Sequence, residues 1–564
     1  MLCGRLFYLQ VIEAENIAAE IQSVRKRIVH LDARRGDIVD RNGNLLAGTR
    51  SLIQLGADPK MVDLEETRAI ALLAGILDVS YPDLFVKLGQ KERIGSDGKT
   101  REVRWIPLAD IDEDLYAAIN ELEVSGVYGN RRYERYYPGK QLASHLVGFI
   151  NKEQIPVMGV EQAVDYYLRG QPGWRETEVD GLRRELAAYR EREVPPRNGL
   201  HVQLTIDQFI QSIVESAIEE LVETSHPKGV SIIVSNPATG DVLALANYPT
   251  FDPNTFWDFP IENQRNRALS DQYEPGSTYK IVPIAAALEE GLINPETQID
   301  CSVERKVFNG VNIPMPADHR NLGIVPVRTV VTKSSNRGAA QIGMLLGEER
   351  LYEYSSKFGF GKLVDWPLSG VAKGSLMTVD RWDGYTISRL PTGYAIGATP
   401  MQVHLAMSTI ANDGVRVSPR LLAKVINADS GTEISLGPDK HTRVLTVKTS
   451  RLMKEMLLSV VSPEGTAVRA ELPGYEVAGK TGTARKIIDG HYSHRNHFGS
   501  FSGFFPASKP EVVITVVVDD ADIPGPAYGG IVAAPIFKSI GEKLIPHMAI
   551  RKPQEWDPFI VSND

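Results

Sequence analysis

The residues best suited to covalent chemistry lie in the segment EPGSTYK, from Glu274 to Lys280. Its Pro-Gly pair predicts a turn, and Ser277 falls where a helix is expected to begin. Residues three apart share one face of a helix, so the amine of Lys280 can come within reach of the Ser277 hydroxyl. An unactivated serine is a poor nucleophile, and a lysine with a depressed pKa can act as its base. Alone the pattern is a weak signal, because most S-x-x-K sequences are chance matches or helix caps.

A second triplet, Ser334-Ser335-Asn336, follows an apolar stretch of the sequence. A hydroxyl (Ser334) and an amide (Asn336) two residues apart can point into a common cleft. By itself such a triplet is usually a helix N-cap, so it gains meaning only from its neighbours.

The third element is KTGT, from Lys480 to Thr483. We predict a strand here, in which Gly482 allows a backbone or a ligand to approach closely. The edge of such a strand offers N–H groups and the hydroxyls of Thr481 and Thr483 to an extended anionic peptide. The stretch from Gly474 to Thr481 also matches the bare phosphate-loop pattern G-x-x-x-x-G-K-T. We reject a phosphate loop, because no buried strand precedes it and turn residues follow where a helix should run.

The order of the three triplets carries more information than any one of them. S-x-x-K, S-D-N and K-T-G together are the set found in penicillin-binding proteins and class A β-lactamases, and here the middle triplet reads S-S-N. With this set the chain resembles a class B penicillin-binding protein, most closely the cell-division (septal) branch. Further stretches that resemble the family are RGDIVDRNGNLLA at 35–47, ERYYPGKQLASHLVGF at 134–149, GVEQAVDYYLRG at 159–170 and YGGIVAAPIF at 528–537.

Local patterns give a first view of the architecture. Two apolar runs between Val230 and Asn247 surround a Pro-Ala-Thr-Gly turn and predict a hairpin, and the segment 511–520 reads as an apolar strand. Strands at both ends of a region with helices between them suggest an α+β domain whose sheet is closed by distant segments. Asp207 is placed to cap a helix over 209–222.

The N-terminal third reads as a different kind of region. Asn42-Gly43 predicts a hairpin within 31–48, and helices are predicted over 13–30 and 114–122. The polar stretch 170–198, with several arginines and a Pro-Pro pair, reads as a linker or exposed crossover.

The resemblance implies an α+β fold in two main parts. These are a C-terminal serine transpeptidase domain, of the penicillin-binding and β-lactamase type with mixed helices on an antiparallel sheet, and an elongated α+β pedestal before it. The boundaries that we expect are a membrane-proximal helix left from an N-terminal anchor (1–30), a pedestal for dimerisation or partner binding (31–198), the transpeptidase domain (199–552) and a C-terminal tail (553–564). The apolar stretch 1–12 is too short to cross a bilayer alone, since a span needs about 20 residues.

The resemblance also implies a mechanism. Ser277 attacks the penultimate carbonyl of a stem peptide that ends in D-alanyl-D-alanine, and Lys280 accepts the proton. Ser334 relays a proton to the leaving D-alanine, and Asn336 orients Lys280 and the substrate amide. The remaining motif is the substrate-binding strand: Lys480 provides positive potential for the terminal carboxylate, together with Thr481, Gly482 and Thr483. The backbone N–H groups of Ser277 and Thr483 hold the oxyanion.

Composition excludes several other functions. The chain has 564 residues with a formal net charge of −9, which argues against nucleic-acid binding over its surface. Its two cysteines cannot form a disulfide framework or a zinc ribbon. His491, His494 and His497 have a spacing that could hold zinc, but we interpret them as a solvated loop beside the cleft. No metal and no organic cofactor is expected.

The implied partners are peptidoglycan stem peptides, their lipid-linked precursor, β-lactam antibiotics, a membrane glycan polymerase and other divisome proteins. The implied location is the bacterial cytoplasmic membrane at the septum, with the globular part in the periplasm or outside the membrane. Three alternatives stay open: a catalytically silent β-lactam-binding divisome scaffold, a D,D-carboxypeptidase, and a β-lactamase-like hydrolase. The last needs a carboxylate that positions water, and no such glutamate can be identified in the sequence.

Overall fold

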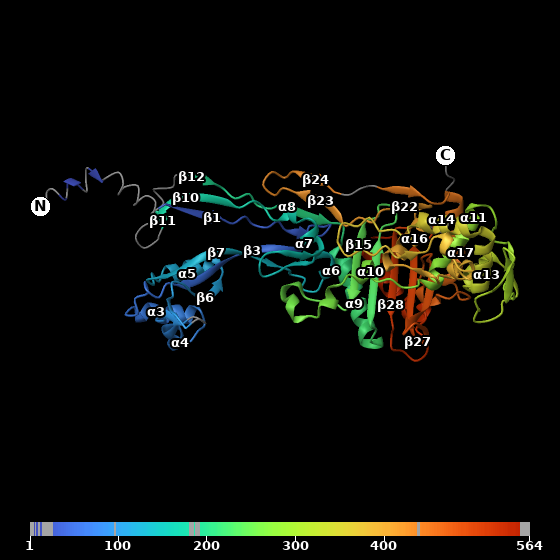
Figure 1. Ribbon diagram of the computed structural model, residues 1–564, viewed down its shortest axis with the longest axis horizontal. Helices are drawn as coiled ribbons and strands as arrows, with labels where there is room; N and C mark the ends of the chain where they lie inside the picture. Colours follow the sequence, from blue (N-terminus) through green and yellow to red (C-terminus); the bar gives the residue numbers. More distant parts are fainter. Residues whose placement is uncertain are drawn as a thin grey trace.

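A computed structural model describes residues 5, 7, 8, 12, 13, 26–94, 98–179, 185–186, 192–436 and 440–552. The molecule is elongated: strands β1 and β10 and helices α3 to α5 lie toward one end, and the sheet that contains β27 and β28 lies toward the other (Figure 1). The predicted tail 553–564 and most of the predicted helix 1–30 fall outside the described residues.

The C-terminal half is built on a five-stranded antiparallel sheet. Its strands, in spatial order, are β15 (Val242–Tyr248), β14 (Gly229–Ser235), β28 (Val512–Asp519), β27 (His491–Phe505) and β26 (Ala478–Ile488). The predicted hairpin is β14–β15, and β28 pairs with β14 along its whole length. The prediction of a sheet closed by distant segments is therefore confirmed. Strand β26 lies at the edge and pairs only with β27 among the described strands.

Helices cover both faces of this sheet. On one face, Phe537 of α19 (Ala534–His547) packs edge-on against Phe501, and α19 also contacts α9 (Gln208–Ser225). On the other face, His404 of α16 (Pro400–Ala411) hydrogen-bonds to Thr515, whose partner across the strand pair is Ser502. Successive side chains of a strand point to opposite faces, so Phe501 faces the α19 layer and Ser502 faces the α16 layer. Asp207 caps α9 as predicted, by accepting from two backbone N–H groups.

The remaining helices of this half pack around the sheet and the serine segment. They are α10 (Arg267–Ser270), α11 (Ile281–Glu289), α12 (Val327–Thr332), α13 (Asn336–Leu346), α14 (Glu348–Phe358), α15 (Thr386–Arg389), α17 (Val447–Val461) and α18 (Gly529–Val532), with short 3-10 turns η3 (Pro253–Asp258), η4 (Ile261–Gln264), η5 (Gly276–Lys280), η6 (Val379–Arg381), η7 (Leu390–Thr392) and η8 (Val468–Ala470). Four two-stranded pairs join them: β16 (Gln298–Asp300) with β19 (Ile324–Pro326), β17 (Arg305–Phe308) with β18 (Val311–Pro314), β20 (Ser375–Leu376) with β21 (Ile396–Gly397), and β22 (Val415–Val417) with β25 (His441–Arg443).

The N-terminal part contains the predicted hairpin and helix. Strands β2 (Ile38–Val39) and β3 (Leu45–Ala57) pair antiparallel around Asn42-Gly43, and Gly43 has a φ of +88°, which glycine adopts readily. The predicted helix near 114–122 is α5 (Glu113–Asn120), with Asp112 as its N-cap. Beside β3 lie β6 (Ile106–Ile111) and β7 (Val127–Tyr136), and α3 (Thr67–Ile76), α4 (Tyr81–Leu88) and the pair β4 (Glu92–Ile94) and β5 (Thr100–Glu102) complete this region.

One sheet links this region to the C-terminal half. Its strands run in the order β24 (Glu433–Ser435), β23 (Leu422–Ile426), β13 (His201–Leu204), β2, β3 and β6. Between β7 and β13 the chain forms α6 (Ser144–Val147), β8 (Phe149–Ile150), β9 (Pro156–Met158), α7 (Gly159–Ala163) and α8 (Asp165–Leu168).

Two predictions about the N-terminal part were wrong. The stretch read as a linker contains β10 (Gly173–Val179), β11 (Glu185–Leu186) and β12 (Arg192–Val194). Residues 26–30, expected to be helical, belong to strand β1 (Lys26–Leu31). Strand β10 lies between β1 and β12 in an antiparallel sheet. Alternating polar side chains with few apolar ones look like a linker in sequence, and only pairing between distant strands reveals the sheet.

A buried ion network joins three stretches that are far apart in the sequence. Glu161 is fully buried and accepts hydrogen bonds from Arg35 (2.7 Å) and from Arg135 (2.6 Å). Arg35 also contacts Asp165 at 2.5 Å, and the Tyr137 hydroxyl donates to Glu161 at 3.3 Å. The segments at 35–47, 134–149 and 159–170 singled out in the sequence therefore meet at one carboxylate.

Within the described residues, no single helix has both the length and the apolar composition needed to cross a bilayer. Helices α3 and α4 meet those criteria only when taken together, and they are bent by 117° relative to each other.

Candidate active site

The serine of the first motif lies at the start of a short 3-10 turn. Turn η5 contains both Ser277 and Lys280, and α11 continues directly from it. Residues i and i+3 eclipse each other in a 3-10 helix, so this turn brings the two side chains to the same side, as the spacing predicts. Ser277 is partly exposed, whereas Lys280 has only 1% of its surface exposed. The hydroxyl is thus reachable from solvent, whereas the amine of the same turn is buried.

Lys280 is held by the second motif. Its Nζ donates to the backbone oxygen of Ser334 at 2.5 Å and to the side-chain oxygen of Asn336 at 2.7 Å, with Ser334 Oγ at 3.3 Å. These partners lie 54 and 56 residues further along the chain. A neutral amine has two N–H groups and one lone pair, so the two shorter contacts can take both N–H groups and leave the lone pair to accept a proton.

The third motif reaches the same hydroxyl. Lys480 Nζ donates to Ser334 Oγ at 2.9 Å and to the Thr481 backbone oxygen at 3.2 Å. Ser334 therefore lies between two buried lysines from separate motifs. Its φ of +58° is unusual for a residue with a side chain, and such conformations persist where surrounding contacts enforce them.

Burial lowers the pKa of both lysines. It lowers the pKa of Lys280 to about 7, against a partial increase from the negative charge of Asp318. Burial and the nearby positive charge of Lys280 hold the pKa of Lys480 well below its ordinary value. A carboxylate bound beside Lys480 would favour its charged form, so substrate binding and protonation of Lys480 are expected to be coupled.

Glycines allow the serine turn to pack directly against strand β26. A Cβ on Gly482 would lie 2.9 Å from the Pro275 backbone oxygen and 2.8 Å from a Thr278 carbon. A Cβ on Gly276 would lie 2.7 Å from the Thr483 backbone oxygen, and Gly276 has a φ of +56°. The close approach predicted for Gly482 is therefore to the backbone of the serine segment. It places the free edge of β26 beside Ser277.

The two threonines of the third motif point away from the lysine contacts. In the antiparallel register Lys480 pairs with Ser502 on the α16 face, whereas Thr481 pairs with Phe501 on the α19 face. The Thr481 hydroxyl hydrogen-bonds to Thr466 at 2.7 Å, and the Thr483 hydroxyl accepts from the Gly529 N–H at 3.3 Å. The predicted contacts of these hydroxyls with a carboxylate stay predictions. The Thr483 hydroxyl accepts from Gly529 and still has its own O–H to donate. The strand at Lys480 and Thr481 also agrees with the rejection of a phosphate loop.

Comparisons with known proteins agree with this arrangement. A family described as the penicillin-binding protein transpeptidase domain matches residues 230–542, and the penicillin-binding protein dimerisation domain matches residues 30–204. The chain is a class B penicillin-binding protein of the FtsI type.

Full-length relatives of this penicillin-binding protein share a similar level of identity. Peptidoglycan D,D-transpeptidase FtsI of Escherichia coli is 30% identical over 96% of this chain and 88% of its own length. Stage V sporulation protein D of Bacillus subtilis is 30% identical over 97% of this chain and 83% of its own length. A crystal structure of penicillin-binding protein 3 from Mycobacterium tuberculosis in complex with aztreonam is 28% identical, covers 93% of this chain and 98% of that one, and has a TM-score of 0.70.

Asp318 is a residue of this penicillin-binding protein's site that no sequence motif marks. Its carboxylate accepts from the Ser335 hydroxyl at 2.6 Å, from the backbone N–H of Asn336 and from that of Arg337 at 3.3 Å. The Asn336 side chain in turn donates to the Ala317 backbone oxygen at 2.7 Å. A carboxylate at the first turn of α13 is favourable, because helix N-termini attract negative charge. Asp318 therefore holds the turn that presents Ser334 and Asn336.

Replacing Asp318 with asparagine tests this role. The charge that raises the pKa of Lys280 is removed, so the midpoint of the pH–rate profile for β-lactam acylation should shift to lower pH. The rate should also fall, by about tenfold, because Ser335 and Asn336 lose a charged acceptor worth about 1.5–3 kcal/mol. Asp300→Asn is the matched control, since Asp300 is nearby but contacts Ser302 instead. An unchanged midpoint in Asp318→Asn would show that Asp318 is only part of a loop.

The three histidines lie in a strand and not in the expected loop. His491, His494 and His497 belong to β27, which continues from the Asp489-Gly490 turn. His491 and His494 are exposed, and His497 is buried with its Nδ1 3.0 Å from the Arg495 backbone oxygen. No cluster of three or more metal-ligating side chains occurs in the part of the chain that the structure describes.

Proposed function

We propose that this chain is a peptidoglycan D,D-transpeptidase with Ser277 as its nucleophile. The observation that supports this most is the position of Ser334 Oγ between Lys280 and Lys480, since it links three motifs into one hydrogen-bonded cluster beside Ser277. Such a cluster has a base, a proton relay and a cation for a carboxylate, which are the groups that acyl transfer to serine requires.

In the first half of the reaction a peptide that ends in D-alanyl-D-alanine lies along the free edge of β26. Neutral Lys280 takes the proton of Ser277 as its oxygen attacks the penultimate carbonyl carbon. The backbone N–H groups of Ser277 and Thr483 hold the oxyanion, and such a donor contributes about 3–4 kcal/mol to the transition state. The C–N bond then breaks, and Ser334 passes a proton to the departing D-alanine.

In the second half an amine of a neighbouring stem peptide attacks the acyl ester, loses a proton to the cluster and releases Ser277. A β-lactamase-like hydrolase would instead need a carboxylate that positions water. Among the described residues no carboxylate hydrogen-bonds to Ser277, Lys280 or Lys480. This observation favours transfer to an amine over the β-lactamase-like alternative.

The cellular setting is proposed from the relatives. We place the activity in septal cell-wall synthesis, at the cytoplasmic membrane with the globular part in the periplasm or outside the membrane. The proposed partners are the lipid-linked precursor, a membrane glycan polymerase and other divisome proteins. We divide the chain into a pedestal at 31–198, which would contact partners, and a transpeptidase domain at 199–552.

The pKa of Lys280 leads to a definite pH dependence. Below pH about 7 the amine is charged and cannot accept a proton, so the acylation rate should rise about tenfold per pH unit and then level off above pH 7. The groups that face Lys280 are Lys480 on β26 and Asp318 and Cys301 on the α13 side. Rates of acylation by benzylpenicillin measured from pH 5 to 10 check this. A profile that still rises steeply at pH 9–10 would contradict a buried neutral base.

Transfer itself is tested with a thioester analogue of the stem peptide and an excess of a D-amino acid as acceptor. A transpeptidase gives the amide as main product, and Ser277→Ala abolishes it. A carboxypeptidase gives the free acid even with acceptor present. A silent scaffold gives neither product, although it is folded and acylated by penicillin.

A further inference from the structure

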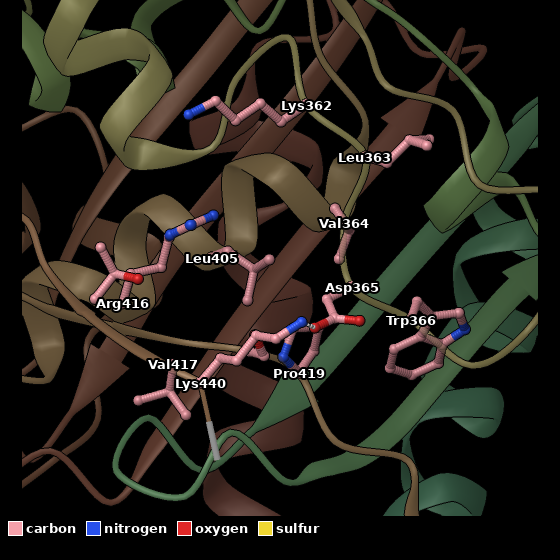
Figure 2. A pocket seen from close by; sticks show the side chains of 12 residues that line it. Lys362, Leu363, Val364, Asp365, Trp366, Leu405, Arg416, Val417, Pro419 and Lys440 are labelled. Carbon is pink, nitrogen blue, oxygen red and sulfur yellow. Dashed lines mark hydrogen bonds and ion pairs between the residues drawn. The ribbon is translucent and has the colours of Figure 1, made fainter. Parts of the chain in front are cut away.

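A second pocket lies apart from the serine cluster. It has a volume of about 410 Å³ and is bounded by the segment 362–366 after α14, by Leu405 of α16, and by the strand pair β22–β25 (Figure 2). None of the residues to which a catalytic or binding role is given above lines it. Any ligand here therefore occupies a site distinct from the one at Ser277.

Arg416 of β22 places an unpaired cation in this pocket. Among the described residues, no acceptor hydrogen-bonds to its guanidinium and no carboxylate forms an ion pair with it, and its Nε is buried. The guanidinium packs closely against the backbone at Gly359, where an added Cβ would lie 2.7 Å from the Arg416 Nη1. Burial lowers the pKa of Arg416, and no neighbouring negative charge offsets this effect. Arg416 is half-buried, and a partly desolvated cation without a partner gains free energy when an anion joins it.

A second free cation lines the same pocket. Lys362 has no ion-pair partner among the described residues, whereas Lys440 contacts Asp365 at 2.7 Å. In Figure 2 the nitrogen ends of Lys362 and Arg416 both lie toward the left of the view, away from the Lys440–Asp365 pair. Two positive charges of the pocket are therefore not neutralised by the protein. Thr442 pairs with Arg416 across the two strands and so adds a hydroxyl to the same face.

Apart from Ser418, the rest of the lining is apolar or aromatic. It is formed by Leu363, Val364, Trp366, Leu405, Val417 and Pro419. A pocket with aliphatic walls and two free cations matches a ligand with an apolar body and an anionic head. The planar guanidinium of Arg416 suits two parallel hydrogen bonds to the oxygens of a carboxylate or a phosphate.

We propose that the Arg416 pocket binds a small amphiphilic anion, in which a carboxylate or phosphate head is joined to a short apolar chain. The head would contact Arg416 and Lys362, and the chain would lie against Leu405 and Val417. This inference does not depend on the proposed transpeptidase activity.

Calorimetric titration of the full chain with hexanoate and with hexyl phosphate, at constant ionic strength, tests the proposal. Saturable binding is expected for at least one of them, with acetate, inorganic phosphate and hexanol all binding more weakly. The stronger of the two main probes identifies the head group. Arg416→Gln should weaken binding at least about tenfold, because it removes a charge-assisted hydrogen bond.

Two further variants make the result specific. Lys362→Gln should also weaken binding, whereas Lys509→Gln, which removes an exposed cation outside the pocket, should not. Arg416→Gln should retain its melting temperature and its rate of acylation by penicillin, since it relieves an unpaired charge. The proposal is overturned if Arg416→Gln binds the probes as the parent does, because the bound probe would then be an adventitious ion only. It is equally overturned if hexanol binds as tightly as hexanoate, or if Arg416→Gln unfolds at a clearly lower temperature.

Discussion

Replacing Lys280 with glutamine is expected to slow acylation of Ser277 by about 10²–10⁴-fold, the usual contribution of a positioned general base. Glutamine is similar in length and can still donate to Ser334 and Asn336, but its amide cannot accept the serine proton at neutral pH. The loss should therefore appear in the rate of acylation and not in the fold.

The rate of adduct formation with benzylpenicillin, followed by mass over time, measures this effect. Lys333→Gln is a suitable control, because Lys333 is next to Ser334 in sequence but its Nζ contacts the Glu464 backbone oxygen. Lys280→Gln should also lose the rise in rate between pH 5 and 7. A variant with nearly the parent rate and the parent pH profile would mean that Lys280 is not the base.

The second large effect is expected for stability. Replacing Glu161 with glutamine removes the negative charge between Arg35 and Arg135, of which Arg135 has only 2% of its side chain exposed. Breaking a buried ion pair by removal of one partner costs about 3–5 kcal/mol, because the other charge stays buried and uncompensated. The free energy of unfolding of the N-terminal part should fall by this amount.

Urea unfolding followed by circular dichroism measures the change. Glu134→Gln is the matched control, because Glu134 is next to Arg135 in β7 and forms an ion pair with Arg50 near the surface. Such exposed pairs contribute about 0–1 kcal/mol. Equal stability of the two variants would show that the Glu161 network does not hold the three N-terminal stretches together.

The sequence predicted the local elements that have strong short-range signals. Asn42-Gly43 marked a hairpin, Asp207 marked a helix start, and the apolar runs at 230–247 and 511–520 marked strands of one sheet. It failed for the segment 170–198, where β10 pairs with β1, more than 140 residues earlier in the chain, and β11 and β12 pair with β10. Long-range pairing leaves little trace in a polar stretch, whereas turn and cap residues act locally.

In the site too, residues with local sequence motifs were predicted, and residues placed by long-range contacts were not. The triplets identified Lys280, Ser334, Asn336 and Lys480, and the structure brings all four into contact. Asp318 was missed because its role depends on a loop folding back to the start of α13, and its neighbours in sequence carry no motif. The directions of Thr481 and Thr483 could not be predicted either, since they depend on the register between β26 and β27.

Ser277 is proposed as the nucleophile of an acyl-transfer site. Intact-mass measurement after incubation with benzylpenicillin, on the parent chain and on Ser277→Ala, tests this role. One adduct per parent chain that persists for hours is expected, and none on folded Ser277→Ala. An adduct of equal extent on Ser277→Ala, or no adduct on the folded parent chain, would contradict this role.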